Sequence, residues 1–220
     1  MAMRRGNGVL AWWCDVDAPL RDTFMASLTG HLDLLGSVAG VLDTGVYAAV
    51  SGGPHYIVVV ELRDHFVFQT DAFQRAWYGR QGDDRHWSDL ARNYLRNLYR
   101  QIFPTRIDPI MLDREMPPFL SIGRMAVAPI QEEEFNAWYN AVHLPLHVAV
   151  PGCSGGRRFA VVDGQPKYMT IYDVEDGDIR DSAAWQAAST NEAWSLRLRP
   201  LQHDEGSPGV YRRIFPTPAG

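Results

Sequence analysis

A phenylalanine, a tyrosine and a histidine fall on one predicted helical face in the second half of the sequence. Tyr139 follows Phe135 by four residues and precedes His143 by four, the spacing that places side chains on one side of an α-helix. An imidazole beside a phenol at the edge of an apolar cavity provides a general acid or base near neutral pH. We therefore take His143 as the candidate proton carrier and Tyr139 as the group that orients it. The alternative is a buried histidine hydrogen-bonded to a carbonyl that Pro145 leaves free.

Arginines within apolar strands are the second feature with chemical meaning. Arg124 interrupts one predicted strand, and Arg157 and Arg158 open another. A charge in such a place needs an internal partner or an anionic ligand. Glu61 and Asp173 are the predicted internal partners; on the other interpretation the arginines recognise a carboxylate or enolate oxygen. In that case Arg124 stabilises the oxyanion that forms during proton transfer.

Aromatic residues provide the expected walls of a substrate pocket. Trp12 and Trp13 are adjacent on a predicted strand, so their side chains point to opposite faces. One is expected to pack under helices and the other to line a cavity. Aromatic walls suit a flat ligand, but they fill cores equally well. The residues that we expect to contact a substrate are Trp138, Arg158, Tyr168, Trp12 and His31.

Metal, haem and nucleophile motifs are weak. His143 and His147 have the H-x-x-x-H spacing of a metal pair, but Pro145 lies between them and no third ligand is evident. No histidine stands out as a proximal haem ligand. Ser51-Gly52-Gly53-Pro54 joins two strands and opens no helix, so it is not a phosphate loop. We expect no metal and no cofactor.

The elements that must position these residues occur twice along the chain. With an offset of 112 positions, residues 31–64 align with 143–176 without a gap, and 11 of 34 positions are identical, against roughly 2 by chance. The same offset aligns residues 99–105 with 211–217, where six of seven are identical. The sequence predicts two homologous units, 9–105 and 119–217, joined by a linker at 106–118. Phe103 and Phe215 should then occupy equivalent buried positions on closing strands.

Each unit has the same predicted order of elements. A strand (9–16 and 120–127) precedes an amphipathic helix (20–38 and 131–150), and a hairpin follows it. A second helical region comes next, predicted at 71–77 with 88–97 in the first unit and at 183–198 in the second. The fold class is therefore α+β, as two tandem ferredoxin-like β-α-β-β-α-β units. Each sheet leaves one face open, so we expect the two sheets to pack on each other.

One segment of the second unit resembles a known family. Residues 134–146, EFNAWYNAVHLPL, running into Val150-Pro151-Gly152, are similar to the signature of the EthD-like branch of the dimeric α/β-barrel superfamily. The first unit keeps His31, but Asp33 replaces the proline and Ser27 stands at the position that Tyr139 occupies in the second unit. The resemblance implies ferredoxin-like units packed sheet to sheet. Members include cofactor-free monooxygenases, isomerases, polyketide cyclases and haem enzymes, so the reaction stays open.

Composition excludes several classes of protein. The chain has 220 residues, is 46% hydrophobic and carries a formal charge of −5, which is typical of a globular protein and argues against nucleic-acid or anionic-membrane partners. No apolar run is long enough to span a bilayer, and no signal peptide is recognised. Two cysteines without a C-x-x-C motif suggest a reducing, cytoplasmic compartment. We expect a small-molecule partner and allow for a homodimer.

The function that follows from these residues is proton-transfer catalysis without a cofactor. We expect an isomerase, cyclase or lyase acting on an aromatic, lactone or polyketide-like substrate. One alternative is a cofactor-free monooxygenase or a haem enzyme of the same fold. The other is a ligand-binding protein without catalysis. Loss of the tyrosine and proline from the first-unit motif favours one active site per chain.

Overall fold

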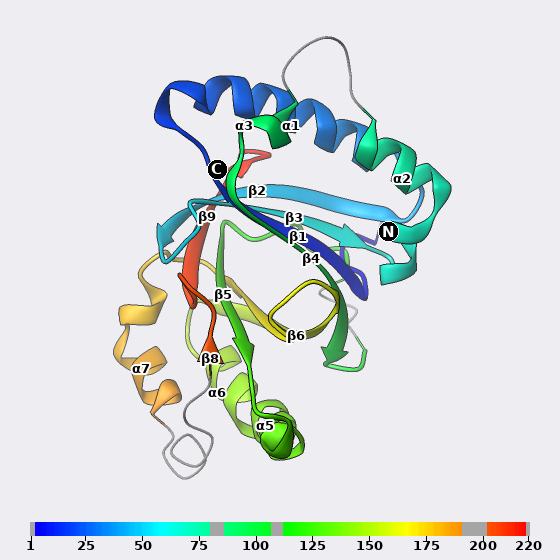
Figure 1. Ribbon diagram of the computed structural model, residues 1–220. Coiled ribbons are helices and arrows are strands. Elements are labelled where there is room, and N and C mark those ends of the chain that lie inside the picture. The colour runs from blue at the N-terminus through cyan, green and yellow to red at the C-terminus, as the bar shows by residue number, and fades with distance from the viewer. Residues whose placement is uncertain (1–2, 80–85, 107–111, 191–201, 219–220) are drawn as a thin grey trace.

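Eight antiparallel strands close into a barrel with helices on two sides (Figure 1). The computed structural model describes residues 3–79, 86–106, 112–190 and 202–218. In the first half, strands β1 (Gly8–Asp15), β2 (Val41–Ser51), β3 (Tyr56–Leu62) and β4 (Arg92–Phe103) lie in the order β4-β1-β3-β2. Helices α1 (Arg21–Gly36), α2 (Asp71–Tyr78) and α3 (Trp87–Leu90) cover their outer face.

The second half repeats this strand order. Strands β5 (Phe119–Ala126), β6 (Cys153–Asp163), β7 (Tyr168–Val174) and β9 (Gly209–Phe215) lie in the order β9-β5-β7-β6. The short strand β8 (Gln202–His203) pairs with the end of β5. Helices α5 (Glu132–Trp138), α6 (Leu144–Val148) and α7 (Ala183–Ser189) cover the opposite side of the barrel. No helix among the described residues is long and apolar enough to cross a membrane.

The two seams that close the barrel have the same register. Strand β4 pairs with β6, and β9 pairs with β2. Tyr99 lies opposite Val161 in the first seam, and Tyr211 lies opposite Ala49 in the second. At an offset of 112, Tyr211 corresponds to Tyr99 and Val161 corresponds to Ala49, so the two seams pair equivalent residues. Both seams also have irregularities at corresponding positions. The last strand of each half therefore pairs with one strand of its own half and one strand of the other half.

Side-chain alternation along the strands produces three separate cores. The barrel core fills the interior and includes Trp13, Tyr47, Tyr99, Phe159 and Tyr211. The α1 core lies between the barrel and α1–α3, and the α5 core lies between the barrel and α5–α7. Trp12 belongs to the α1 core and Trp13 to the barrel core, which confirms that adjacent tryptophans point to opposite faces.

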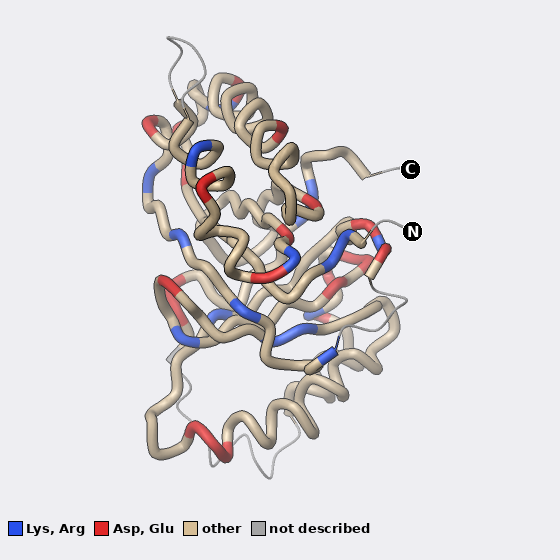
Figure 2. Tube along the Cα trace, turned by 90° about the vertical axis from the view of Figure 1, so that its right-hand side faces the viewer, with Lys and Arg blue, Asp and Glu red and all other residues tan. Residues whose placement is uncertain are grey.

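A buried ion-pair network lies at one end of the barrel. Arg5 is 2% exposed and bridges Glu61 and Asp173, with nitrogen–oxygen distances of 3.1 and 3.3 Å. Arg157 binds the same Glu61 carboxylate through two further hydrogen bonds. The prediction of internal partners is confirmed for Arg157. Figure 2 shows that basic residues gather on the strands in the middle of the molecule.

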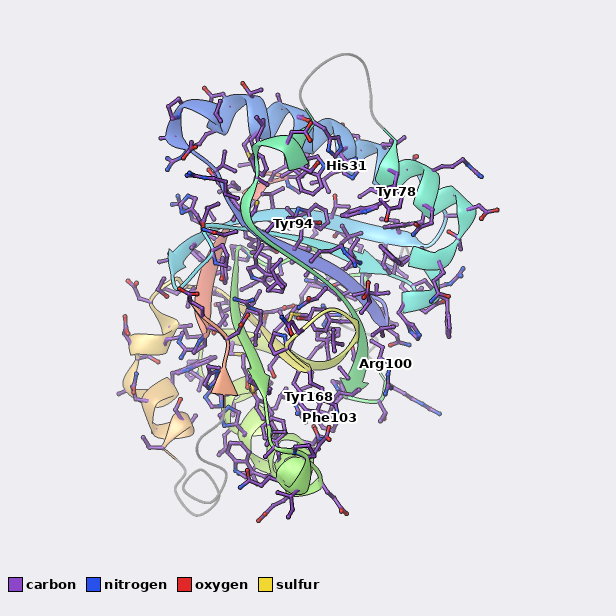
Figure 3. The ribbon with its side chains drawn as sticks, viewed as in Figure 1. His31, Tyr78, Tyr94, Arg100, Phe103 and Tyr168 are labelled. Atoms are coloured by element: carbon purple, nitrogen blue, oxygen red, sulfur yellow. The ribbon has the colours of Figure 1, made fainter. Side chains whose placement is uncertain are left out.

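Several local predictions were wrong. Residues 92–97, predicted as helix, belong to β4, because pairing with β1 outweighs their local helical preference. Phe103 and Phe215 do end corresponding strands, but both are only half-buried. Each packs against the core of the opposite half: Phe103 lies beside the α5 core, near Tyr168, and Phe215 beside the α1 core (Figure 3). The helix predicted at 183–198 is α7 up to Ser189, and residues 191–198 lie outside the described residues.

Candidate functional site

A π-helical turn interrupts the helix that carries the candidate catalytic residues. It spans Tyr139–His143 between α5 and α6. Before the turn, buried Phe135 contacts Tyr168 in the way that Phe24, 111 residues earlier, contacts Tyr56; both ring centroid distances are 5.4 Å. After the turn, the offset between the halves is 112. The extra residue of the second half is therefore absorbed in the π-helical turn, a feature that is frequent at functional sites.

The π-helical turn forms one wall of a pocket between the helices and β5. The pocket has a volume of about 130 Å³, close to that of a cavity of roughly 150 Å³ that binds benzene in another protein. It therefore has room for a single six-membered ring. The described residues that line it are Ser121, Gly123, Met125, Tyr139, His143, His147, Tyr172, Arg180, Trp185, Ser189, His203 and Pro208.

His143 is a neutral imidazole inside an aromatic stack. Its ring centroid lies 4.7 Å from that of Trp138, 4.4 Å from Tyr139 and 4.2 Å from His147. Burial, together with the nearby His147 and Arg158, lowers the pKa of His143 to about 3. The imidazole is therefore uncharged near neutral pH and has a lone pair available to accept a proton.

His147 has a different role, because both of its ring nitrogens are occupied. Nδ1 lies 2.8 Å from the carbonyl oxygen of His143, and Nε2 lies 3.1 Å from the Ser189 hydroxyl. A carbonyl only accepts, so Nδ1 carries the proton. The lone pair of Nε2 in the neutral ring then faces the Ser189 hydroxyl, whose one proton is shared between Nε2 and the Trp185 carbonyl 2.9 Å away. Burial lowers the pKa of His147, which agrees with the neutral form. His147 thus fixes the π-helical turn and links it to α7.

Two arginines of the second half lie close to this pocket. Arg180 lines it, and its Nη1 lies 3.5 Å from the Ser121 hydroxyl. Arg158 is 1% exposed and lies behind Tyr139, with its guanidinium carbon 4.2 Å from the centre of that ring. Its nitrogens donate to the amide oxygens of Asn136 and Asn140. Burial lowers the pKa of both guanidinium groups, so a positive charge is held there at a cost in solvation.

Arg124 lies elsewhere, contrary to the expectation that it would reach His143. It alternates with Gly123 on β5, so its side chain points into the barrel while the pocket residues point outward. There it forms an ion pair with Asp204 and stacks on Trp13 at 4.5 Å. Arg124 instead borders a larger, polar cavity of about 630 Å³ at the barrel end, together with Asp15, Gly53 and residues 204–206.

The remaining predicted substrate-binding residues surround the pocket or lie in the other half. Trp138, Arg158 and Tyr168 belong to the shell behind Tyr139 and His143; Tyr168 is held by hydrogen bonds with Glu132 and Asn136. Trp12 lies beneath α1 in the first half, in the α1 core. His31 is a buried residue of α1 itself (Figure 3). The structure thus brings only His143 and Tyr139, of the eight predicted residues, to the pocket surface.

The corresponding place in the first half is filled by tryptophans. Trp12 on β1 lies opposite Val58, and Gly123 on β5 lies opposite Thr170, so the two positions correspond in the sheet. The Trp12 ring stacks on Trp87 at 5.3 Å and meets Trp77 at 5.1 Å. His31 lies against the same cluster, 5.5 Å from Trp77. Where the first half has an indole, the second half has no side chain at all.

Three residues that shape the pocket were missed from the sequence. Side chains alternate between the two faces of a strand, as those of Trp12 and Trp13 do on β1. The same rule places Gly123 and Arg124 on opposite faces of β5 and would have assigned Gly123, rather than Arg124, to the pocket. Arg180 and Trp185 are far from His143 in sequence, and no motif marks them. Their position depends on the packing of α7 against α6, which only the folded chain reveals.

The described residues do not fit a haem. A haem needs an axial side chain with a free ligating atom and room for its macrocycle. The neutral imidazole of His143 supplies such an atom on the pocket wall, so the obstacle is space. The pocket of about 130 Å³ is smaller than the roughly 300–1,000 Å³ typical of pockets for larger ligands. In the described part of the chain, no group of three or more His, Cys, Asp or Glu side chains is placed to hold a metal ion.

Comparison with known proteins adds structural neighbours only. No family model matches the sequence, and no curated protein matches it. A putative monooxygenase from Fusobacterium nucleatum is 11% identical with a TM-score of 0.57, covering 94% of this chain and 97% of that one. An anthrone oxidase-like protein is 12% identical with a TM-score of 0.61, covering 94% and 90%. A chlorite dismutase from Candidatus Nitrospira defluvii is 11% identical with a TM-score of 0.59, covering 94% and 91%.

These neighbours correct the expected reaction. Monooxygenase-like, oxidase-like and chlorite dismutase proteins contradict the expectation of an isomerase, cyclase or lyase, and they agree better with the oxygen-using alternative. At such low identity the likeness shows the fold alone. The chain has the α+β fold of dimeric α/β-barrel proteins, with a closed antiparallel barrel of eight strands.

Proposed function

We propose that this protein is a cofactor-free oxygenase that acts on a single-ring, ionisable aromatic compound. The observation that carries the proposal is the neutral imidazole of His143 on the wall of a pocket sized for one ring. The names of two neighbours, a putative monooxygenase and an anthrone oxidase-like protein, are consistent with oxygen chemistry. Neither a haem nor a metal is needed for the steps below.

The proposed reaction begins with proton transfer. His143 accepts the proton of a ring hydroxyl, and Tyr139, with its ring 4.4 Å away, holds the imidazole in place. The negative charge of the ring then stabilises the imidazolium, which offsets the low proton affinity of His143 in the free protein. Base catalysis of this kind contributes about 100- to 10,000-fold to a rate.

Oxygen then reacts with the electron-rich anion. One electron passes from the phenolate to O₂, and the resulting radical pair joins to form a bond between oxygen and a ring carbon. Cleavage of the O–O bond, with loss of the hydrogen from that carbon, leaves a quinone carbonyl and one water molecule. One oxygen atom enters the product and the other becomes water, so the substrate itself supplies the electrons.

We further propose that the chain arose by fusion of two ferredoxin-like units, 9–105 and 119–217, joined by 106–118. The shared strand order and the equal register of the two seams support this. The H-x-P-L segment that follows Tyr139 supports membership of the EthD-like branch. On this view both units began with a histidine on the first helix, and only the unit with Gly123 kept an open pocket.

His143→Ala should lower oxygen uptake by about 100-fold or more, because it removes the general base. The assay uses the chelator-treated full chain with a panel of hydroxylated single-ring compounds at pH 7, and ¹⁸O₂ labelling follows one oxygen atom into the product. His31→Ala is the matched control and should leave the rate within about twofold of wild type. Uptake that survives in His143→Ala would overturn the proposal.

A further inference from the structure

The charges around the pocket are not balanced within the protein. Of the other buried arginines, Arg5, Arg124 and Arg157 each form an ion pair with a carboxylate, and Arg213 donates to the carbonyl oxygen of Met116. In the described part of the chain, neither buried Arg158 nor half-buried Arg180 has a carboxylate oxygen within 4 Å. Such charges are costly to maintain without a counterion, and two of them beside one pocket favour an anionic ligand there.

Arg158 illustrates how the charge is held without being neutralised. Its partners are two amide oxygens and the faces of Phe135, Tyr139 and Tyr168, at 5.0, 4.2 and 5.5 Å. These groups fix the guanidinium but carry no formal charge. The corresponding residue in the first half is Val46, which faces Phe215 as Arg158 faces Phe103. The half with the open pocket thus has a buried cation at the position where the other half has a valine.

Arg180 places a second cation on the pocket surface itself. Among the described residues its guanidinium has one hydrogen-bond partner, the Ser121 hydroxyl, and it lies 6.0 Å from the centre of the Trp185 ring. Most of its donors are free to bind a planar anion in a fork. Beside it, the Tyr172 hydroxyl is buried in the pocket wall next to that of Tyr139.

We propose that the pocket selects a ring that carries a fixed negative charge, namely an aromatic carboxylate. Arg180 binds the carboxylate, and the Tyr172 hydroxyl donates a hydrogen bond to it. The positive charge of Arg158, behind the Tyr139 ring, attracts the anion electrostatically. Trp185 and Tyr139 contribute aromatic surface for the ring. This inference rests on the proposed function for the assignment of the pocket as the substrate site, and it names the class of substrate: single-ring hydroxycarboxylates rather than neutral phenols.

The test compares benzoate with benzamide, which have the same shape and differ in charge. Calorimetric titration of the full chain should show benzoate binding about 10- to 100-fold more tightly, the range expected for hydrogen bonds to a charged group. Arg180→Gln should abolish this preference, and Arg180→Lys should restore part of it. Tyr172→Phe, which conserves volume, should reduce it. Arg92→Gln removes an equal charge at an exposed ion pair and should change nothing.

Each outcome decides one question. Equal affinity for the two probes, binding of neither at 10 mM (roughly 2.7 kcal/mol of binding free energy), or a preference that persists in Arg180→Gln would overturn the inference. A benzoate preference that depends on Arg180, in a protein that consumes no oxygen with any hydroxybenzoate, would leave the carboxylate site standing and reject the oxygenase. Oxygen uptake with neutral phenols alone would do the reverse.

Discussion

Gly123→Trp is expected to abolish ligand binding while leaving the fold intact. An indole at this position fills the pocket as Trp12 fills the corresponding place in the first half. A Cβ atom at 123 would meet only Met125 Cε, at 3.0 Å, and this is the end of a flexible side chain. Exclusion of one buried ring should weaken benzoate binding by about 100-fold or more. Calorimetric titration measures this.

The control is a glycine-to-tryptophan change outside the pocket. A Cβ atom on Gly30, in α1, meets nothing within 4 Å, so Gly30→Trp should bind benzoate like wild type. The reverse change, Trp12→Gly, should lower the free energy of unfolding by about 3–5 kcal/mol, because it leaves a cavity in the α1 core. Unchanged benzoate affinity in Gly123→Trp would mean that the ligand binds elsewhere, for example in the larger cavity beside Arg124.

Glu61→Gln is expected to cause a large loss of stability. The carboxylate is fully buried and binds both Arg5 and Arg157. Its removal leaves two buried guanidinium groups with too few counterions, which typically costs 3–5 kcal/mol for a buried pair. Urea unfolding measures this free energy. As a control, Glu115→Gln breaks the exposed pair with Arg4 and should cost less than about 1 kcal/mol. Equal small losses in both variants would show that the network is not a determinant of stability.

The stabilisation that Glu61 provides is expected to depend on pH. Burial raises the pKa of Glu61, but Arg157 and Arg5 outweigh this and hold the pKa below its usual value. The unfolded chain therefore binds this proton first as the pH falls, and the stabilisation is lost below about pH 4.3, the ordinary pKa of glutamate. The stability difference between wild type and Glu61→Gln should be constant near neutral pH and shrink in acid.

The buried histidines act in a different pH range. Burial lowers the pKa of His31 to about 4 and that of His143 to about 3. Unfolded histidines bind protons below about pH 6.5, so the wild-type protein should lose stability from that point downward. Replacing either histidine should flatten this part of the profile without affecting the Glu61 range.

The sequence predicted the parts of the fold that repeat. Identity at an offset of 112 located the hairpins, the main helices and the strands that close the barrel. It also placed Tyr139 and His143 together, because helical spacing is a local property. The π-helical turn was missed, since an offset of 111 before it and 112 after it looks in sequence like a small misalignment.

Long-range packing explains what could not be predicted. Residues 92–97 have a helical pattern, but pairing with β1 holds them as a strand. Arg180 and Trp185 reach His143 only because His147 and Ser189 join α6 to α7. The open pocket itself depends on Gly123, whose meaning appears only when the filled position of Trp12 is compared with it.

The central claim is that the His143 pocket holds one small ring and no haem, and a titration with haemin tests it most directly. Haemin is added to the metal-free full chain while absorbance in the Soret region is recorded. We predict no saturable binding and no defined Soret band at one equivalent, because the pocket of about 130 Å³ beside His143 is too small for the macrocycle. A stoichiometric complex with a sharp Soret band, lost in His143→Ala, would contradict the account and assign the site to a haem.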